Sequence, residues 1–248
     1  SWSWDSKDGL AAERVSSRLP DSVFDMHAHL YRQTDLGASN PELTSSGPAV
    51  AGLPEWRSSL SRLIGGRRIA GALFFPYPTS TCDTAAANNY LIQQLDAAPE
   101  SRGLMLVTPS MTRKEAEKIL ENPQIAGFKP YHVFSSHKPT FQAPLSSYLP
   151  EWAWSLADER SLIITLHMVR DRALADQDNQ REIVENASRN PNARLILAHA
   201  ARGFHSRNTV DGLPALRGLQ NIWFDASGIC EPVAIAAIIS AFSPRRLL

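Results

Sequence analysis

The sequence predicts an α/β fold and, within that class, a (β/α)8 barrel. Short apolar runs recur along the 248 residues, and amphipathic stretches separate them. The runs are apolar on both faces, which is typical of parallel strands that helices cover on both sides. Eight such strands in one alternation favour a closed barrel over an open, doubly wound sheet.

The expected strands are brief and rich in β-branched residues, Leu and Phe. They cover 23–26, 69–75, 103–107, 125–128, 162–166, 193–198 and 222–224, and 245–248 reads as the start of an eighth. Helices are expected between the strands, over 84–98, 112–120, 150–160, 179–188, 210–219 and 231–242, and an apolar spacing of three to four residues marks the first of them. Thr112 and Glu115 form a capping-box pattern at the start of the second of these helices. The long connections 31–53 and 131–149 are expected to be loops at the mouth of the barrel.

Composition limits the function classes. The chain has 25 basic and 25 acidic side chains and a pI near 7, which argues against a nucleic-acid-binding face. No apolar stretch approaches the roughly 20 residues that span a bilayer, and the first residues do not resemble a signal peptide. Two cysteines, Cys82 and Cys230, cannot form a disulfide framework. We expect a cytoplasmic protein with an N-terminal extension over 1–20 and a barrel domain over 21–248.

Five expected strands end in side chains that bind metals or move protons. In chain order these are His27 with His29, Lys129, His167, His199 and Asp225. Residues i and i+2 of a strand share a face, so His27 and His29 form half of a divalent metal site. Histidines at equivalent places on later strands argue against coincidence. Three other histidines fall in expected loops, as surface or substrate-contacting residues: His132, His137 and His205.

Five segments carry a resemblance to a known family. They read FDMHAH at 24–29, AGFK at 126–129, ITLH at 164–167, LILAHA at 195–200 and NIWFDASG at 221–228. In this order they resemble the metal-dependent amidohydrolase superfamily, and within it the amidohydrolase 2 branch that includes the aminocarboxymuconate semialdehyde decarboxylase-like enzymes. The resemblance runs from about residue 21 to the last residue. It is the set of motifs that is specific, since no single one is.

The resemblance implies roles for the strand-end residues. His27, His29 and His167 match the metal ligands, with zinc as the expected ion and manganese as the alternative. His199 matches a catalytic histidine that positions or activates water in mononuclear members and binds the second metal in binuclear ones.

Lys129, the second catalytic candidate, matches a lysine that is carboxylated and bridges two metals in binuclear members; it could instead hold an anionic substrate group or pack structurally. Asp225 is expected to bond to the substrate or to neighbouring groups, less readily to a metal.

One feature departs from the family pattern. Members carry an Asp at the end of the eighth strand, whereas this sequence stops within 245–248. We therefore expect a barrel cut within its eighth strand, with the C-terminal end missing. Unpaired strand edges invite association, so a homo-oligomer is possible.

The expected activity is that of a metal-dependent hydrolase. A metal-activated water would attack a small amide or lactone, and His199 would assist the proton transfer. Arg170 and Arg202, and with them Arg172, follow strands closely and are candidates to bind a substrate carboxylate, although exposed loop arginines are the alternative. Non-oxidative decarboxylation and a catalytically silent binding module remain open. A nucleotide-binding sheet is disfavoured because no glycine-rich phosphate loop follows any strand.

Overall fold

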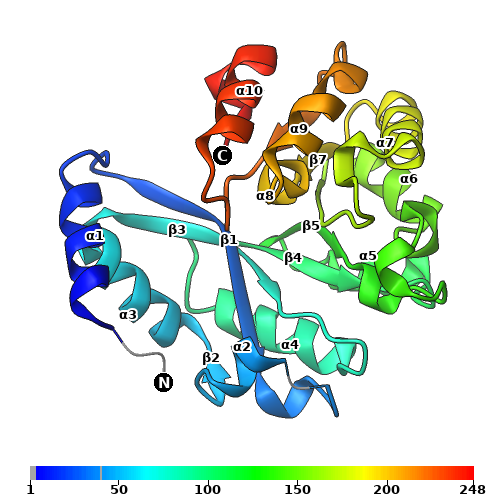
Figure 1. The fold of residues 1–248 in the computed structure, drawn as a ribbon. Helices are drawn as coiled ribbons and strands as arrows, with labels where there is room; N and C mark the ends of the chain where they lie inside the picture. Colours follow the sequence, from blue (N-terminus) through cyan, green and yellow to red (C-terminus); the bar gives the residue numbers. More distant parts are fainter. Residues whose placement is uncertain (1–3, 40) are drawn as a thin grey trace. The chain divides into compact units, whose positions relative to one another are not determined.

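The computed structural model describes residues 4–39 and 41–248 (Figure 1). The chain divides into two compact units, Ser1–Gly103 and Leu104–Leu248. Each unit alternates strands and helices.

The first unit is built on β1 (Val23–Arg32), which pairs in parallel with β3 (Ile69–Pro76) and antiparallel with the short β2 (Val50–Ala51). β3 is buried from Gly71 onward, as its continuous apolar sequence predicts. The helices are α1 (Ser6–Ser16), α2 (Glu42–Ser45), α3 (Leu53–Ile64) and α4 (Thr84–Leu95), with 3-10 turns at Gln33–Asp35 and Gly66–Arg68. Helix α1 packs against α3 (Figure 1).

The second unit continues the alternation. Its strands hydrogen-bond in chain order: β4 (Arg102–Val107, whose first two residues belong to the first unit and pair with β3), β5 (Ile125–Pro130), β6 (Ile163–Leu166), β7 (Arg194–Leu197) and β8 (Ile222–Phe224). The helices are α5 (Arg113–Ile119), α6 (Glu151–Arg160), α7 (Gln177–Arg189), α8 (Ala198–Arg202), α9 (Ser206–Gly212) and α10 (Pro232–Phe242). Six 3-10 turns lie at His132–Phe134, Thr140–Gln142, Leu145–Ser147, Ala173–Ala175, Leu213–Leu216 and Pro244–Arg246.

The strand order agrees with the sequence prediction. The parallel strands follow one another in the order of the chain, as a (β/α)8 barrel requires, and β2 is an added antiparallel strand that makes the sheet mixed. The eighth strand expected over 245–248 is present only at its end. Arg245 and Arg246 lie in the 3-10 turn Pro244–Arg246, whereas Leu247 forms an isolated parallel bridge with Phe224 and the Leu248 N–H donates to the Phe224 carbonyl at 2.8 Å.

Several element bounds differ from the prediction. The connection 31–53 contains α2 and β2, and the sequence analysis did not anticipate α1 or α3. The helix expected over 210–219 begins earlier, at Ser206, and gives way to a 3-10 turn at Leu213–Leu216. Pro214 lies in that turn, and a proline has no N–H to continue an α-helical ladder.

A glycine sets the spacing of β5 and β6. Gly127 has φ +152°, and a Cβ added there would lie 1.9 Å from the Ile163 carbonyl oxygen. Only glycine lets the two backbones approach this closely. Lys129 follows two residues later on the same strand, so this contact also fixes the position of the lysine.

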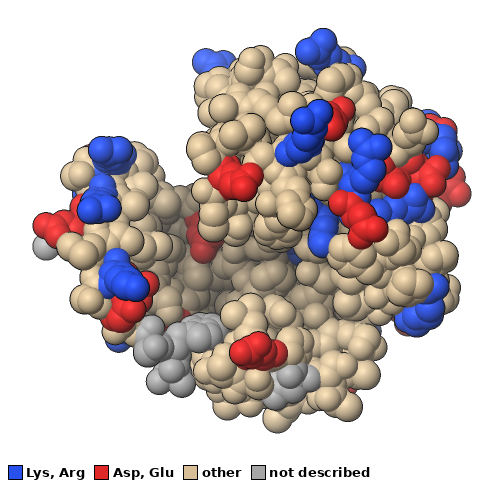
Figure 2. Space-filling view, in the orientation of Figure 1, with Lys and Arg blue, Asp and Glu red and all other residues tan. Residues whose placement is uncertain are grey.

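The surface carries mixed charge. Figure 2 shows basic and acidic side chains side by side over α5, α6 and α7, where Arg113 pairs with both Glu117 and Glu159. Within the described ranges 4–39 and 41–248, no helix is long and apolar enough to cross a membrane.

Candidate active site

The first unit carries the predicted histidine pair. His27 and His29 do not end β1, as the sequence predicted, but lie within it, because the strand continues to Arg32 by pairing with β2. A register shift between Asp25 and Ala28 interrupts the pairing with β3 at this point. The two half-buried imidazole rings nevertheless lie next to each other, with centroids 5.2 Å apart. Two adjacent imidazoles suit a divalent transition metal.

A backbone carbonyl faces the His29 ring, and the Asp25 carboxylate holds the backbone of His27. His29 Nδ1 lies 3.3 Å from the Pro76 carbonyl oxygen, which can only accept, so Nδ1 carries the proton and Nε2 carries the lone pair. The Asp25 carboxylate accepts from the His27 backbone N–H at 3.0 Å and from Trp56 Nε1 at 2.9 Å. Together with α3, these side chains line a pocket of about 410 Å³ in this unit.

The second unit holds His167, which follows β6 and is buried, with 8% of its surface exposed. Burial, together with the charges of Lys129, His199, Arg202 and His132, lowers the pKa of His167 well below its usual value. The ring is therefore neutral at neutral pH. Its Nδ1 is buried and has no hydrogen-bond partner among the described residues. A neutral, desolvated imidazole is a suitable metal ligand.

Three rings lie against the His167 imidazole. The ring of Tyr131 stacks on it at 4.7 Å, that of His132 lies 5.9 Å away, and that of His199 meets it edge-on at 5.2 Å. Burial lowers the pKa of His132, and Arg202 lowers it further. The stack therefore offers neutral, polarisable faces rather than charge.

Lys129 lies on β5 and has no exposed surface. Burial lowers the pKa of its ammonium from 10.5 to about 7, against the opposing influence of the Asp225 carboxylate. Near neutral pH the amine is therefore present in both its charged and its neutral form. This state suits proton transfer as well as anion binding.

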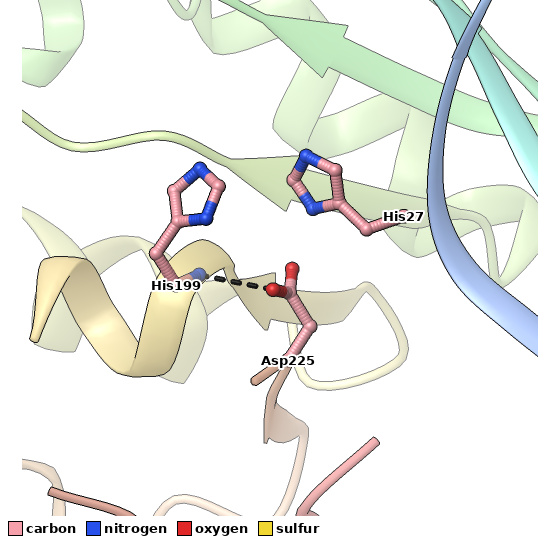
Figure 3. A group of neighbouring side chains, drawn as sticks. All are labelled: His27, His199 and Asp225. Carbon is pink, nitrogen blue, oxygen red and sulfur yellow. Dashed lines mark hydrogen bonds between the residues drawn. The ribbon is translucent and has the colours of Figure 1, made fainter. Parts of the chain in front are cut away.

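His199 sits on an unusual backbone. The sequence placed it at the end of a strand, but β7 ends at Leu197, and residues 199–202 all have φ between 51° and 61°. Non-glycine residues seldom adopt the left-handed conformation, and four in succession require support from neighbours. The Asp225 carboxylate accepts from the His199 N–H at 3.0 Å (Figure 3), and the Asp225 carbonyl accepts from Ala200 N–H at 2.6 Å.

Ser227 completes this arrangement. Its carbonyl oxygen lies 2.8 Å from His199 Nδ1, and its hydroxyl lies 2.9 Å from the same nitrogen. The hydroxyl also lies 2.5 Å from Asp225 Oδ1, which accepts in addition from the Ser227 backbone N–H at 3.1 Å. The sequence analysis assigned no role to Ser227. The Asp-x-Ser spacing directly after β8 is the signal that points to it, because such segments form local side-chain bonds.

The two arginines predicted to bind substrate differ in their surroundings. Arg170 Nη1 bonds to the Asp176 and Asp178 carboxylates at 2.9 and 2.8 Å, so its charge is already paired. The Arg202 guanidinium is half-buried, lies 4.6 Å above the Phe141 ring, and pairs with no carboxylate of the described chain. Arg172 is exposed, as are the loop histidines His137 and His205.

Comparisons with known proteins identify the family. The amidohydrolase family model Amidohydro_2 matches residues 24–248. A search of curated proteins found no match.

Solved structures share the fold. An amidohydrolase from Burkholderia multivorans with bound HEPES is 14% identical, with a TM-score of 0.65 over 91% of this chain and 82% of that one. A putative 2-pyrone-4,6-dicarboxylic acid hydrolase from Pseudomonas putida is 15% identical (TM-score 0.63; 93% and 82% covered). A dihydroxybenzoic acid decarboxylase from a Polaromonas species, with bound manganese and 2-nitroresorcinol, is 13% identical (TM-score 0.54; 92% and 85% covered). With a family model matched over nearly its whole length, this chain belongs to the amidohydrolase family.

Proposed function

We propose that the protein is a metal-dependent hydrolase that opens a small lactone or amide. The observation that carries the proposal is the state of His167: it is buried and neutral, with an unpartnered Nδ1, and lies beside His199. A desolvated imidazole with no bond on one nitrogen fits a metal ligand better than a structural histidine, which would satisfy that nitrogen. Membership of the amidohydrolase family supports the same assignment.

We assign the metal ligands to His27, His29 and His167. The orientation of His29 fits this role, since its Nδ1–H donates to Pro76 and its Nε2 carries the lone pair. A divalent ion bound there, zinc or manganese, would supply a Lewis acid that polarises the scissile carbonyl and activates water. Manganese is the ion in the Polaromonas relative.

The proton-transfer groups come from the second unit. His199 would accept a proton from the attacking water and return it to the leaving group. Lys129, whose pKa is about 7, would hold a proton or an anionic substrate group. Asp225 would fix the backbone of His199, through bonds that the structure contains.

Arg202 is the better candidate for binding a substrate carboxylate. Its guanidinium lacks an ion-pair partner among the described side chains and lies over Phe141, whereas Arg170 is paired with two aspartates. A planar carboxylated substrate would form a charge-assisted hydrogen bond with the guanidinium and stack on neighbouring rings.

Non-oxidative decarboxylation is the second candidate, because a half-buried guanidinium that no carboxylate of the described chain neutralises can hold the carboxylate that leaves as carbon dioxide. In that reaction His199 would protonate the carbon atom instead of activating water. The hydrolase and the decarboxylase among the structural relatives make both tests worthwhile.

The test combines metal content with turnover. Protein supplied with Zn²⁺ or Mn²⁺ is assayed on lactones, amides and aromatic carboxylates, with acid release and carbon dioxide measured separately. His29→Asn and His167→Asn should lose most bound metal, while the exposed control His137→Asn should keep it. Carbon dioxide without hydrolysis would select the decarboxylase, and full metal binding without turnover would support a silent binding module. Full metal content in both ligand variants would contradict the site.

A further inference from the structure

We propose that Ser227 is a positioning residue that fixes the tautomer of His199, with the proton on Nδ1 and the lone pair on Nε2. The inference rests on the proposed function in one respect, the role of His199 as a base. The tautomer itself follows from hydrogen-bond geometry within the second unit.

The assignment begins with the groups that face Nδ1. The Ser227 carbonyl oxygen, at 2.8 Å, can only accept a hydrogen bond. The Ser227 hydroxyl, at 2.9 Å, has a single hydrogen to give. The tautomer therefore depends on where that hydrogen points.

The hydroxyl hydrogen points to Asp225. Oδ1 of this carboxylate lies 2.5 Å from Ser227 Oγ and also accepts from the backbone N–H groups of His199 and Ser227. With two backbone donors aimed at it, Oδ1 is an acceptor in all three bonds. Ser227 Oγ therefore presents only lone pairs to the imidazole, and both neighbours of Nδ1 are acceptors.

Nδ1 must consequently carry the proton, and in the neutral imidazole Nε2 carries the lone pair. A base needs that lone pair on the nitrogen directed at its substrate. The opposite tautomer would place a lone pair on Nδ1 against two oxygen acceptors and leave a proton on Nε2.

Residues 225–227 hold both the backbone and the ring of His199. Asp225 holds the left-handed turn at residues 199–202 through its carboxylate and its carbonyl, and the Thr209 hydroxyl supports the same turn by donating to the Ala200 carbonyl at 2.7 Å. Ser227 joins the turn to the ring, since one side chain contacts both the carboxylate and Nδ1. A change at Ser227 therefore acts on the ring while the supports of the turn remain.

The experiment reads the tautomer directly. Full-length protein labelled with ¹⁵N-histidine is studied by long-range ¹⁵N correlation NMR at about pH 8, above the ordinary imidazole pKa of about 6.5, with His199→Gln used to assign the signals. We expect a protonated Nδ1 and an unprotonated Nε2 for His199. A protonated Nε2 with a bare Nδ1 would overturn the proposal.

Two variants test the hydroxyl. Ser227→Ala keeps the backbone carbonyl that faces Nδ1, so Nδ1 should stay protonated. Loss of the hydroxyl contact should nevertheless lower kcat roughly tenfold with little change in KM, because the ring loses one of the two groups that position it, and Ser227→Thr should restore kcat. The control Ser155→Ala removes a half-buried hydroxyl on α6 and should change neither the tautomer nor kcat. A wild-type kcat in Ser227→Ala would refute the role of the hydroxyl in positioning the ring. Because the NMR readout needs neither metal nor substrate, a correct tautomer without turnover counts against the proposed function and not against this inference.

Discussion

The two units hold their histidines in different ways. In the first unit, His27 and His29 lie half-buried on one strand; the His27 backbone N–H donates to the Asp25 carboxylate, and His29 Nδ1 faces the Pro76 carbonyl. In the second unit, His167 is buried beside the cationic Lys129 and Arg202, and His199 sits on a left-handed turn.

The difference shows where the fold tolerates unfavourable backbone conformation and desolvation. His29 lies in extended backbone, where one carbonyl, that of Pro76, selects its tautomer. In the second unit, His167 is desolvated and lies close to basic groups that lower its pKa, while the half-buried His199 depends on Asp225 to hold its backbone. Such concentrated strain and perturbed pKa values are typical of groups that move protons.

The largest expected loss of stability comes from a change at Gly127, where β5 and β6 of the second unit approach closely. Gly127→Ala should lower the free energy of unfolding by about 4 kcal/mol, because the added Cβ would lie 1.9 Å from a backbone oxygen. Gly218→Ala is the matched control: its φ is +96°, but no atom lies within 4 Å of the added Cβ. Urea unfolding measures both. Equal losses would show that backbone strain alone, rather than the close approach of β5 and β6, explains the effect.

The next prediction concerns the buried ammonium of Lys129. The pKa of Lys129 falls from 10.5 in the unfolded chain to about 7 in the fold, so between these pH values the unfolded chain binds more protons and stability rises with pH. At pH 7 and below, the fold carries the full cost of the buried ammonium. Lys129→Met should therefore raise stability at pH 7 by about 4 kcal/mol, because the pKa lies about 3.5 units lower in the fold and each unit corresponds to about 1.4 kcal/mol, with no gain above pH 10.5.

Urea unfolding from pH 7 to 10.5 checks this prediction, and the exposed Lys114→Met on α5 serves as control. The slope of stability against pH should disappear in Lys129→Met alone. A slope that persists there would show that Lys129 is not the group that titrates.

A smaller effect is expected for Arg202, whose guanidinium lies over the Phe141 ring. Arg202→Gln should raise KM for carboxylated substrates about tenfold, or about 1.4 kcal/mol, with little effect on substrates that lack a carboxylate. Arg170→Gln is the comparison, because its guanidinium is paired with Asp176 and Asp178. Steady-state kinetics on matched substrate pairs gives the answer. A larger KM change in Arg170→Gln would exchange the roles of the two arginines.

The smallest expected change in stability concerns the hydrogen bond between Trp56 and Asp25 in the first unit. Trp56→Phe removes the indole N–H that donates to Asp25 at 2.9 Å and should cost about 1 kcal/mol. Leu60→Ala on the same helix provides a packing control for the pocket. Thermal unfolding with bound-metal analysis measures both quantities. A loss of metal in Trp56→Phe beyond its loss of stability would mean that Asp25 does more than orient β1.

The sequence determined the alternation of parallel strands and their order, and it named the side chains that we propose for the chemistry. Apolar runs and strand-end polar residues report burial and local periodicity, which are properties of neighbours along the chain. The pattern at 23–29, 125–129 and 222–225 was therefore sufficient to predict β1, β5 and β8 with their polar residues.

The tertiary structure alone decided how those side chains are tuned. That His167 is neutral, that the pKa of Lys129 is about 7, and that Ser227 faces His199 Nδ1 all depend on groups many residues apart in sequence. The left-handed turn at 199–202 is likewise visible only once Asp225 is in place to hold it. Desolvation and hydrogen-bond partners are set by packing between segments, and no local pattern encodes them.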